Sequence, residues 1–301
     1  MAGFEIVDAH HHLWDLKGKL QYPWLTEQPI AFRYGDYSSI RKSYLPEDYR
    51  RDSGRQNVVA TVHMEAEVAR VDPVAETKWI HGIAEKHGFP NAVIGHAEFE
   101  RDDIAKLLAD HAAYPLMRAI RHKPRAAASA DAIVRGAQGS MGDPKWRRGY
   151  QRLTEHGMHY ELQTPYWHLY EAAELAYGFP HINIVLNHTG LPIERDGAGF
   201  KAWRDAMAAF AAQPNTRVKI SGLGQKGLPW TVEANKSVVL TTIELFGSDR
   251  CMVASNFPVD SVCASFDTIF DGFKAITAGL PEGDRRKIFR DNAIREYRIR
   301  I

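Results

Sequence analysis

The sequence predicts an α/β fold, a single-domain (β/α)8 TIM barrel over residues 1–301. Short apolar runs rich in β-branched residues alternate with segments of helical periodicity, and eight such runs occur without a break in composition. Continuous apolar strands joined by helices are typical of a parallel sheet buried on both faces, and eight of them favour closure into a barrel. An open doubly wound sheet is the alternative, but no glycine-rich phosphate loop follows the first strand.

The expected elements follow one another in a regular order. The strands are expected at 4–7, 57–64, 91–99, 116–122, 158–163, 182–187, 216–222 and 251–255. The helices between most of them are expected at 72–88, 102–114, 143–157, 167–178, 200–212 and 232–247. Several of these helices begin with Asp-Pro or another acidic first turn and three end in Gly, as helix caps commonly do.

Two connections are too long to be simple turns. Residues 13–56 are rich in aromatic side chains, and residues 124–142 are rich in Ala, Gly and Ser. Connections of this length in a compact domain are usually functional or disordered. We expect both loops to lie over the mouth of the barrel, with Trp14, Tyr22 and Trp24 forming part of its wall.

Charge and composition limit the classes of partner. The 38 Lys and Arg residues nearly balance 37 Asp and Glu residues, so the chain lacks the field that nucleic acid or an anionic membrane surface would need. No apolar run reaches the length of a membrane span, and two cysteines do not make a disulfide framework. We expect a soluble, cytoplasmic protein with a small-molecule substrate, and a homo-oligomer is compatible with these features.

Polar side chains gather at the expected strand ends, which meet at one mouth of a barrel. The candidates, in chain order, are His10, His12, His63, Glu65, Arg121, Gln163, His188, Lys219 and Asn256. Because side chains alternate along a strand, His10 and His12 share one face while His11 points away, and His63 is paired with Glu65. Two imidazoles on one face can bind one metal ion or polarise one carbonyl group.

Segments along nearly the whole chain resemble one enzyme family. These segments are "VDAHHHLWD", "LQYPWL", "RAIRH", "ELQTPYWHLYEAAELA", "NIVLNHTGLP", "VKISGL", "RCMVASNFPVD" and "DNAIREYRI". Together they resemble the amidohydrolase-2 branch of the amidohydrolase superfamily, and in particular its sugar lactonases and 2-pyrone-4,6-dicarboxylate lactonase. The resemblance implies a (β/α)8 barrel that hydrolyses small lactones, in some members without a metal and in others with zinc.

The resemblance also implies roles for individual residues. His10 and His12 match the histidine pair that binds a metal or the lactone carbonyl, and His188 matches the histidine beside them. Arg121 lies near the place where relatives hold a substrate carboxylate or hydroxyl group, a task that suits a planar guanidinium. Lactonase relatives commonly have Ser-Asp-Trp-Pro after the last strand, with the Asp as general base, whereas this chain has Asn256 at that position.

With Asn256 at this position the identity of the general base is undetermined, because an amide cannot take a proton from water at neutral pH. Asp260, His63 and Glu65 are the alternatives, while Asn256 itself orients water, binds the substrate or only caps the strand. The cofactor is open too: none is required, or a single divalent metal, zinc by preference, is held by His10, His12 and His188. A binuclear centre is not expected, because the acidic ligand is missing and Arg121 repels cations.

The leading hypothesis is a hydrolase that opens a small polar lactone or related cyclic ester. The substrate-binding residues are then expected to be Arg121, Glu65, Trp14, Lys219 and Gln163. There are two alternatives. One is a lyase that decarboxylates a small aromatic acid without oxidation, and the other is a barrel that binds a ligand without catalysis.

Overall fold

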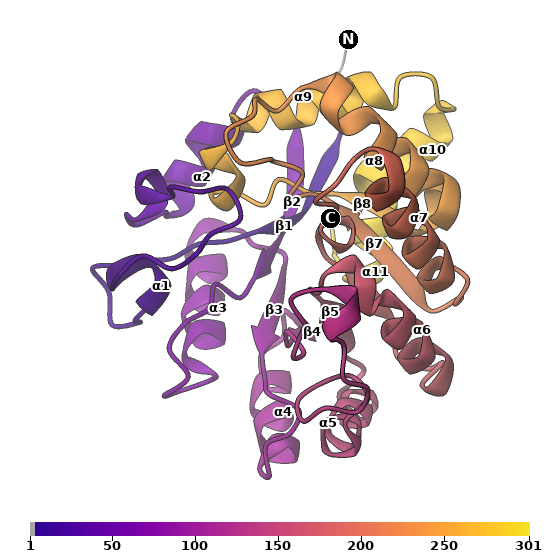
Figure 1. Cartoon of the computed structure of the whole chain (residues 1–301). Helices are drawn as coiled ribbons and strands as arrows, with labels where there is room; N and C mark the ends of the chain where they lie inside the picture. The colour runs from indigo at the N-terminus through magenta and orange to yellow at the C-terminus, as the bar shows by residue number, and fades with distance from the viewer. Residues whose placement is uncertain (1–3) are drawn as a thin grey trace.

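A computed structural model describes residues 4–301, whose eight parallel strands pair in chain order (Figure 1). The strands are β1 (Ile6–His11), β2 (Val58–Met64), β3 (Ala92–His96), β4 (Met117–Arg121), β5 (His159–Leu162), β6 (Ile184–Leu186), β7 (Thr216–Ile220) and β8 (Cys251–Val253). The last strand meets the first beyond its own end, where the His12 amide donates to the Phe257 carbonyl at 2.7 Å. The predicted barrel is confirmed, with every predicted strand in place.

The helices lie outside the sheet and confirm the expected alternation. They are α3 (Ala75–His87), α4 (Ile104–Ala112), α5 (Pro144–Tyr150), α6 (Leu169–Gly178), α7 (Gly197–Ala211) and α8 (Val232–Phe246). Asp143 caps α5 by accepting from the Lys145 amide, as the Asp-Pro sequence predicts. The predicted elements stop at β8, whereas the structure continues with α9 (Phe266–Ile276), α10 (Glu282–Arg286) and α11 (Asn292–Glu296).

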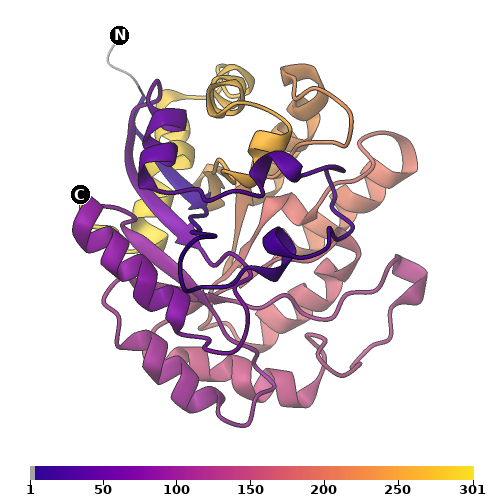
Figure 2. The ribbon, with the colours of Figure 1, turned by 90° about the vertical axis from the view of Figure 1, so that its left-hand side faces the viewer.

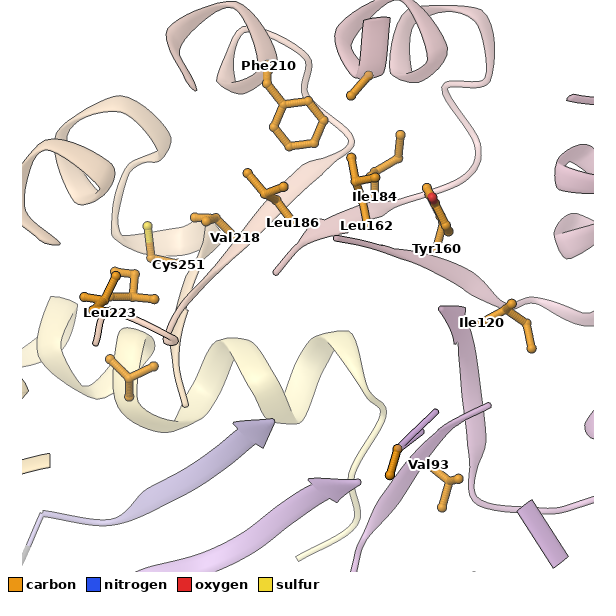
Figure 3. Close-up of a cluster of buried hydrophobic side chains, with 14 of the residues drawn as sticks. Val93, Ile120, Tyr160, Leu162, Ile184, Leu186, Phe210, Val218, Leu223 and Cys251 are labelled. Carbon is orange, nitrogen blue, oxygen red and sulfur yellow. The ribbon is translucent and has the colours of Figure 1, made fainter. Parts of the chain in front are cut away.

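Two apolar layers hold the barrel together. The inner layer fills the barrel with small and branched side chains such as Val62, Ile94 and Val185, and Tyr297 from the C-terminal segment belongs to it. The outer layer lies between strands and helices. In Figure 3 the ring of Phe210 on α7 projects toward the strands that carry Leu186 and Val218. Burial of both faces explains why the strands are predominantly apolar.

The two long loops are placed differently. Residues 13–56 contain α1 (Pro23–Thr26), a 3-10 turn and α2 (Pro46–Ser53), and Figure 2 shows this indigo segment crossing in front of the barrel. Part of it lines the cavity described below. Residues 124–142 contain a short 3-10 turn and contribute nothing to that cavity's described lining. Over residues 4–301, no helix is both long and apolar enough to span a membrane.

Candidate active site

A cavity of about 330 Å³ lies between the carboxyl ends of the strands and the N-terminal loop. Its polar lining consists of His12, Arg33, Glu67, Arg121, Lys123, Gln163, His188 and Asn256, and Trp24, Ile30 and Phe32 are among its apolar residues. This is the end of a parallel barrel at which side chains from different strands converge. The cavity has the size of a small-molecule site.

A β-bulge in β1 places two of the three consecutive histidines together. Asp8 pairs with Thr61 and His11 pairs with His63, so β1 advances by three residues where β2 advances by two. An extra residue of this kind changes the direction of the neighbouring side chains. The Nε2 atoms of His10 and His12 lie 3.3 Å apart. His11 points to the other side, where its Nε2 lies 3.0 Å from Thr61 Oγ1. The predicted separation of His11 from the other two histidines is confirmed.

The hydrogen bonds assign the protons of this pair. His12 Nδ1 lies 2.9 Å from the Met64 carbonyl oxygen, which can only accept, so Nδ1 carries the proton. Burial, followed by the charge of Arg121, lowers the pKa of His12 to about 3, so the ring is neutral at pH 7 and Nε2 has a lone pair. His10 then donates from Nε2, and its Nδ1, which has no partner among the described residues, is the unprotonated nitrogen.

His188 completes the imidazole cluster from the turn after β6. Its Nδ1 lies 2.9 Å from Ser221 Oγ, and its ring packs on that of His10 with centroids 4.7 Å apart. Burial and then the charge of Arg33 hold the pKa of His188 well below its usual range. Gly222 makes this packing feasible, because a Cβ there would lie 2.7 Å from the His188 ring.

Arg121 at the end of β4 is fixed by protein groups. Its Nε donates to Glu65 Oε1 and one Nη to the Glu65 carbonyl, both at 2.6 Å, and the other Nη donates to Gln163 Oε1 at 3.2 Å. Although burial opposes it, the Arg121 charge keeps the pKa of the Glu65 carboxyl well below its usual range. Three of the five donors of Arg121 are therefore used inside the protein.

Asn256 lines the cavity, and its amide nitrogen is hydrogen-bonded within the protein. Its Nδ2 donates to Asp260 Oδ1 at 2.6 Å, and the Tyr34 hydroxyl donates to the same oxygen at 2.8 Å. The carboxylate accepts these bonds, so the Asn256 amide oxygen is the group left for a partner in the cavity. Burial raises the pKa of Asp260, while Arg33 and the two donors lower it.

A buried ion pair lies beneath the histidines. Lys219 Nζ is 2.9 Å from Glu161 Oε2, and both side chains are fully buried. Glu161 also accepts from Asn187 Nδ2 at 2.6 Å and from the Tyr297 hydroxyl at 2.7 Å. Burial opposes ionisation of Glu161, but Lys219 and the hydrogen bonds lower its pKa to about 2. The Lys219 charge, after burial, also lowers the pKa of His10.

Several predicted site residues lie behind the cavity wall. These are His10, Trp14, His63, Glu65, Lys219 and Asp260. His63 lies beside His11, with ring centroids 5.9 Å apart, while the Glu65 carboxylate accepts from Arg121. Trp14 packs edge-on against Trp24, and Trp24 is the ring that lines the cavity. The roles assigned to the predicted site residues, including those that line the cavity, stay predictions.

Three charged residues of the cavity were not predicted. Arg33 comes from the N-terminal loop, Glu67 from the segment after β2 and Lys123 from the segment after β4. Lys123 is two residues beyond Arg121, so the strand-end argument could have included it. No motif marks Arg33, because its position depends on how residues 13–56 fold over the barrel.

The histidines fit a zinc ion only in part. Two ligands of a tetrahedral zinc lie roughly 3.3 Å apart, which matches the Nε2 atoms of His10 and His12. Among residues 4–301, however, no group of three or more His, Cys, Asp or Glu side chains is arranged to hold a metal ion. His188 meets His10 by ring packing, and Lys219 and Arg121 bring positive charge. This arrangement does not fit the three-histidine zinc site.

Known proteins resemble the chain over nearly its whole length. An uncharacterized protein, y4mH, of Sinorhizobium fredii is 41% identical over 306 residues, covering 99% of this chain and all of the relative. An L-fucono-1,5-lactonase of Burkholderia ambifaria is 25% identical over 304 residues, covering 97% of this chain and 95% of the relative. A crystal structure of an amidohydrolase from Burkholderia multivorans with bound zinc superposes with a TM-score of 0.80 at 21% identity, covering 98% of this chain and 99% of that one.

The similarity of that crystal structure shows a shared fold. The family model described as Amidohydrolase matches residues 7–299 and so includes every strand end that contributes to the cavity. The resemblance carried by the sequence motifs is therefore confirmed, and the chain belongs to the amidohydrolase family of hydrolases.

Proposed function

We propose that the protein hydrolyses a small polar lactone to the corresponding hydroxy acid. The observation that carries the proposal is the convergence of complementary groups in one small cavity: a lone-pair nitrogen of His12, an amide oxygen of Asn256 and the donors of Arg121. Ester hydrolysis needs a base for water and donors for the developing oxyanion. The similarity to an L-fucono-1,5-lactonase supports the same reaction class.

The lactone carbonyl is assigned to His188 and Arg121. If the Ser221 hydroxyl donates to His188 Nδ1, the opposite nitrogen carries the proton and can donate into the cavity. Arg121 has two N–H groups that neither Glu65 nor Gln163 uses. These donors stabilise negative charge on the carbonyl oxygen, and loss of one such donor typically costs about 10²- to 10³-fold in rate.

The water is assigned to Asn256 and His12. The Asn256 amide oxygen accepts one hydrogen bond from water. The His10 Nε2–H group turns away from His12 Nε2, whose lone pair then takes the proton as water attacks the carbonyl carbon. The Met64 carbonyl, which already accepts from Nδ1, stabilises the imidazolium that results. Ring opening then releases the alkoxide oxygen, which takes up a proton to become the hydroxyl group of the product. The cavity residues can perform each step without a cofactor.

A panel of sugar lactones and pyrone dicarboxylates, followed by pH-stat titration, tests the proposal. We expect turnover of at least one lactone and a loss of about 10²- to 10⁴-fold in kcat with His12→Ala. His181→Ala is the control, because His181 is exposed and lines a different hollow of the surface. Absence of lactone turnover, together with carbon dioxide release from a hydroxybenzoate, would overturn the proposal in favour of a decarboxylase.

A further inference from the structure

Arg33 differs from the other cations that line the cavity because protein groups do not satisfy it. Its nearest carboxylate oxygen is Asp260 Oδ1 at 3.9 Å, beyond hydrogen-bond distance, and the Arg33 side chain is 29% exposed. No hydrogen bond of its guanidinium is found within residues 4–301, and the group lies over the Tyr34 ring at 4.6 Å. Five donors of a permanent cation thus stand beside the cavity without acceptors.

The neighbouring cations are paired at close range. Arg121 contacts Glu65 at 2.6 Å, and Lys123 Nζ lies 2.5 Å from Glu67 Oε1. Arg121 was the residue expected to bind a substrate carboxylate, but Glu65 and Gln163 already take three of its five donors. Arg33 retains both edges of its guanidinium for that purpose.

The surroundings of Arg33 strengthen its attraction for an anion. Ile30, Ala31 and Phe32 precede it and also line the cavity, and the Phe32 ring stacks on Trp24 with centroids 6.2 Å apart. Apolar walls lower the local dielectric constant and exclude water from a charged contact. A Cβ built on Gly222 would lie 2.7 Å from an Nη atom of Arg33 and 2.7 Å from the His188 ring, so Arg33 lies close to the imidazole that we assign to the carbonyl.

From this geometry we propose that Arg33 determines specificity by binding an anionic substituent of the substrate. The enzyme would then select lactones that carry a carboxylate over neutral lactones of the same size. The lactone part of this statement rests on the proposed function, whereas binding of a carboxylate by Arg33 does not. A binding measurement without turnover therefore separates the two.

The test is isothermal titration calorimetry with D-galacturonate and D-galactose, which share a ring and differ in the carboxylate. Wild-type protein is expected to bind galacturonate more tightly, and Arg33→Gln is expected to weaken that binding by about 10- to 100-fold. Galactose binding should not change. Arg33→Lys should recover part of the affinity, because it restores the charge without the fork.

Arg55→Gln is the matched control for loss of one positive charge, because Arg55 is 82% exposed and pairs with Asp267 outside the cavity. It should bind both sugars like the wild type. Equal galacturonate affinities of wild type and Arg33→Gln, or no preference for galacturonate in the wild type, would overturn the inference. If the wild type shows the preference but hydrolyses no lactone, the proposed function fails while the role of Arg33 stands.

Discussion

Replacement of Asn256 by Asp would restore the residue that lactonase relatives commonly have, yet we expect it to destabilise the protein. The Asn256 Nδ2 atom lies 2.6 Å from Asp260 Oδ1, and both residues are almost fully buried. The substitution removes the donor and sets one carboxyl oxygen against another. Two negative charges 2.6 Å apart repel each other by about 6 kcal/mol at an effective dielectric constant of 20.

Proton uptake limits this penalty. Protonating one carboxyl group with an ordinary pKa near 3.8 costs about 4 kcal/mol at pH 7, which is less than the repulsion. The Asn256→Asp pair should therefore keep one proton in the folded state at neutral pH, so the pKa of that proton is raised by folding. A raised carboxyl pKa gives stability that is present at low pH and is lost as pH rises. Relative to wild type, we expect Asn256→Asp to lose about 1.4 kcal/mol per pH unit between about pH 5 and 7.

Urea unfolding of wild type, Asn256→Asp and Asn256→Ala at pH 4 to 8 measures the effect. Asn256→Ala removes the donor without adding a titrating group, so its loss of stability should depend little on pH. We also expect no gain in lactonase rate for Asn256→Asp at pH 7, because the shared proton occupies the new carboxyl pair. A free-energy difference between Asn256→Asp and wild type that stays constant across this range would refute the reasoning.

Four further predictions follow from the other buried groups. Glu65→Ala leaves Arg121 buried without its carboxylate and should cost about 3–5 kcal/mol in urea unfolding, whereas Glu155→Ala breaks an exposed pair and should cost less than about 1 kcal/mol; equal losses would contradict the arrangement. Burial raises the pKa of Asp8 to about 6 from 3.8, so wild type should lose about 3 kcal/mol relative to Asp8→Asn as pH rises from 4 to 7; parallel stability profiles of the two proteins would exclude this shift. Because His12 is deprotonated above about pH 3, kcat/KM should be flat between pH 5 and 7, and an acid limb near pH 6.5 would point to another base. Elemental analysis of untagged protein should give well below one zinc per chain, and lactonase activity should survive dialysis against a chelator; stoichiometric zinc with activity lost on chelation would contradict the assigned roles of the histidines.

The fold could be predicted because its determinants are local. Each strand is a short apolar run, and helix boundaries such as Asp143 before Pro144 carry their own caps. The pairing of His10 with His12 was also local, since the two residues are close in one strand. The pairing of His63 with Glu65 stays a prediction, because alternation is expected only within a strand and β2 ends at Met64.

The full set of residues that line the cavity could not be predicted from local sequence patterns. Arg33 is separated from β1 by more than twenty residues of loop, and it lies near His188 beside Gly222. The Trp24, Phe32 and Tyr37 rings of the same loop pack together. Such a contact depends on side chains from distant segments, and the sequence pattern of residues 13–56 does not predict it. The strand ends therefore predicted the cavity residues that the barrel itself contributes. The loop contributes Arg33, which no sequence motif predicted.

The Asn at position 256 is best understood together with Asp260. Considered alone, Asn256 is a lost general base, and Asp260, four residues later, is an obvious replacement. In the structure Asp260 is buried behind Asn256, and its Oδ1 accepts from both the Asn256 amide and the Tyr34 hydroxyl. A carboxylate held in this way fixes the amide, so that the amide oxygen faces the cavity. In the proposed mechanism the amide at 256 and the carboxylate at 260 form one unit that orients water. The proton then goes to an imidazole, His12, whose Nε2 lone pair becomes available once the His10 Nε2–H group turns away from it.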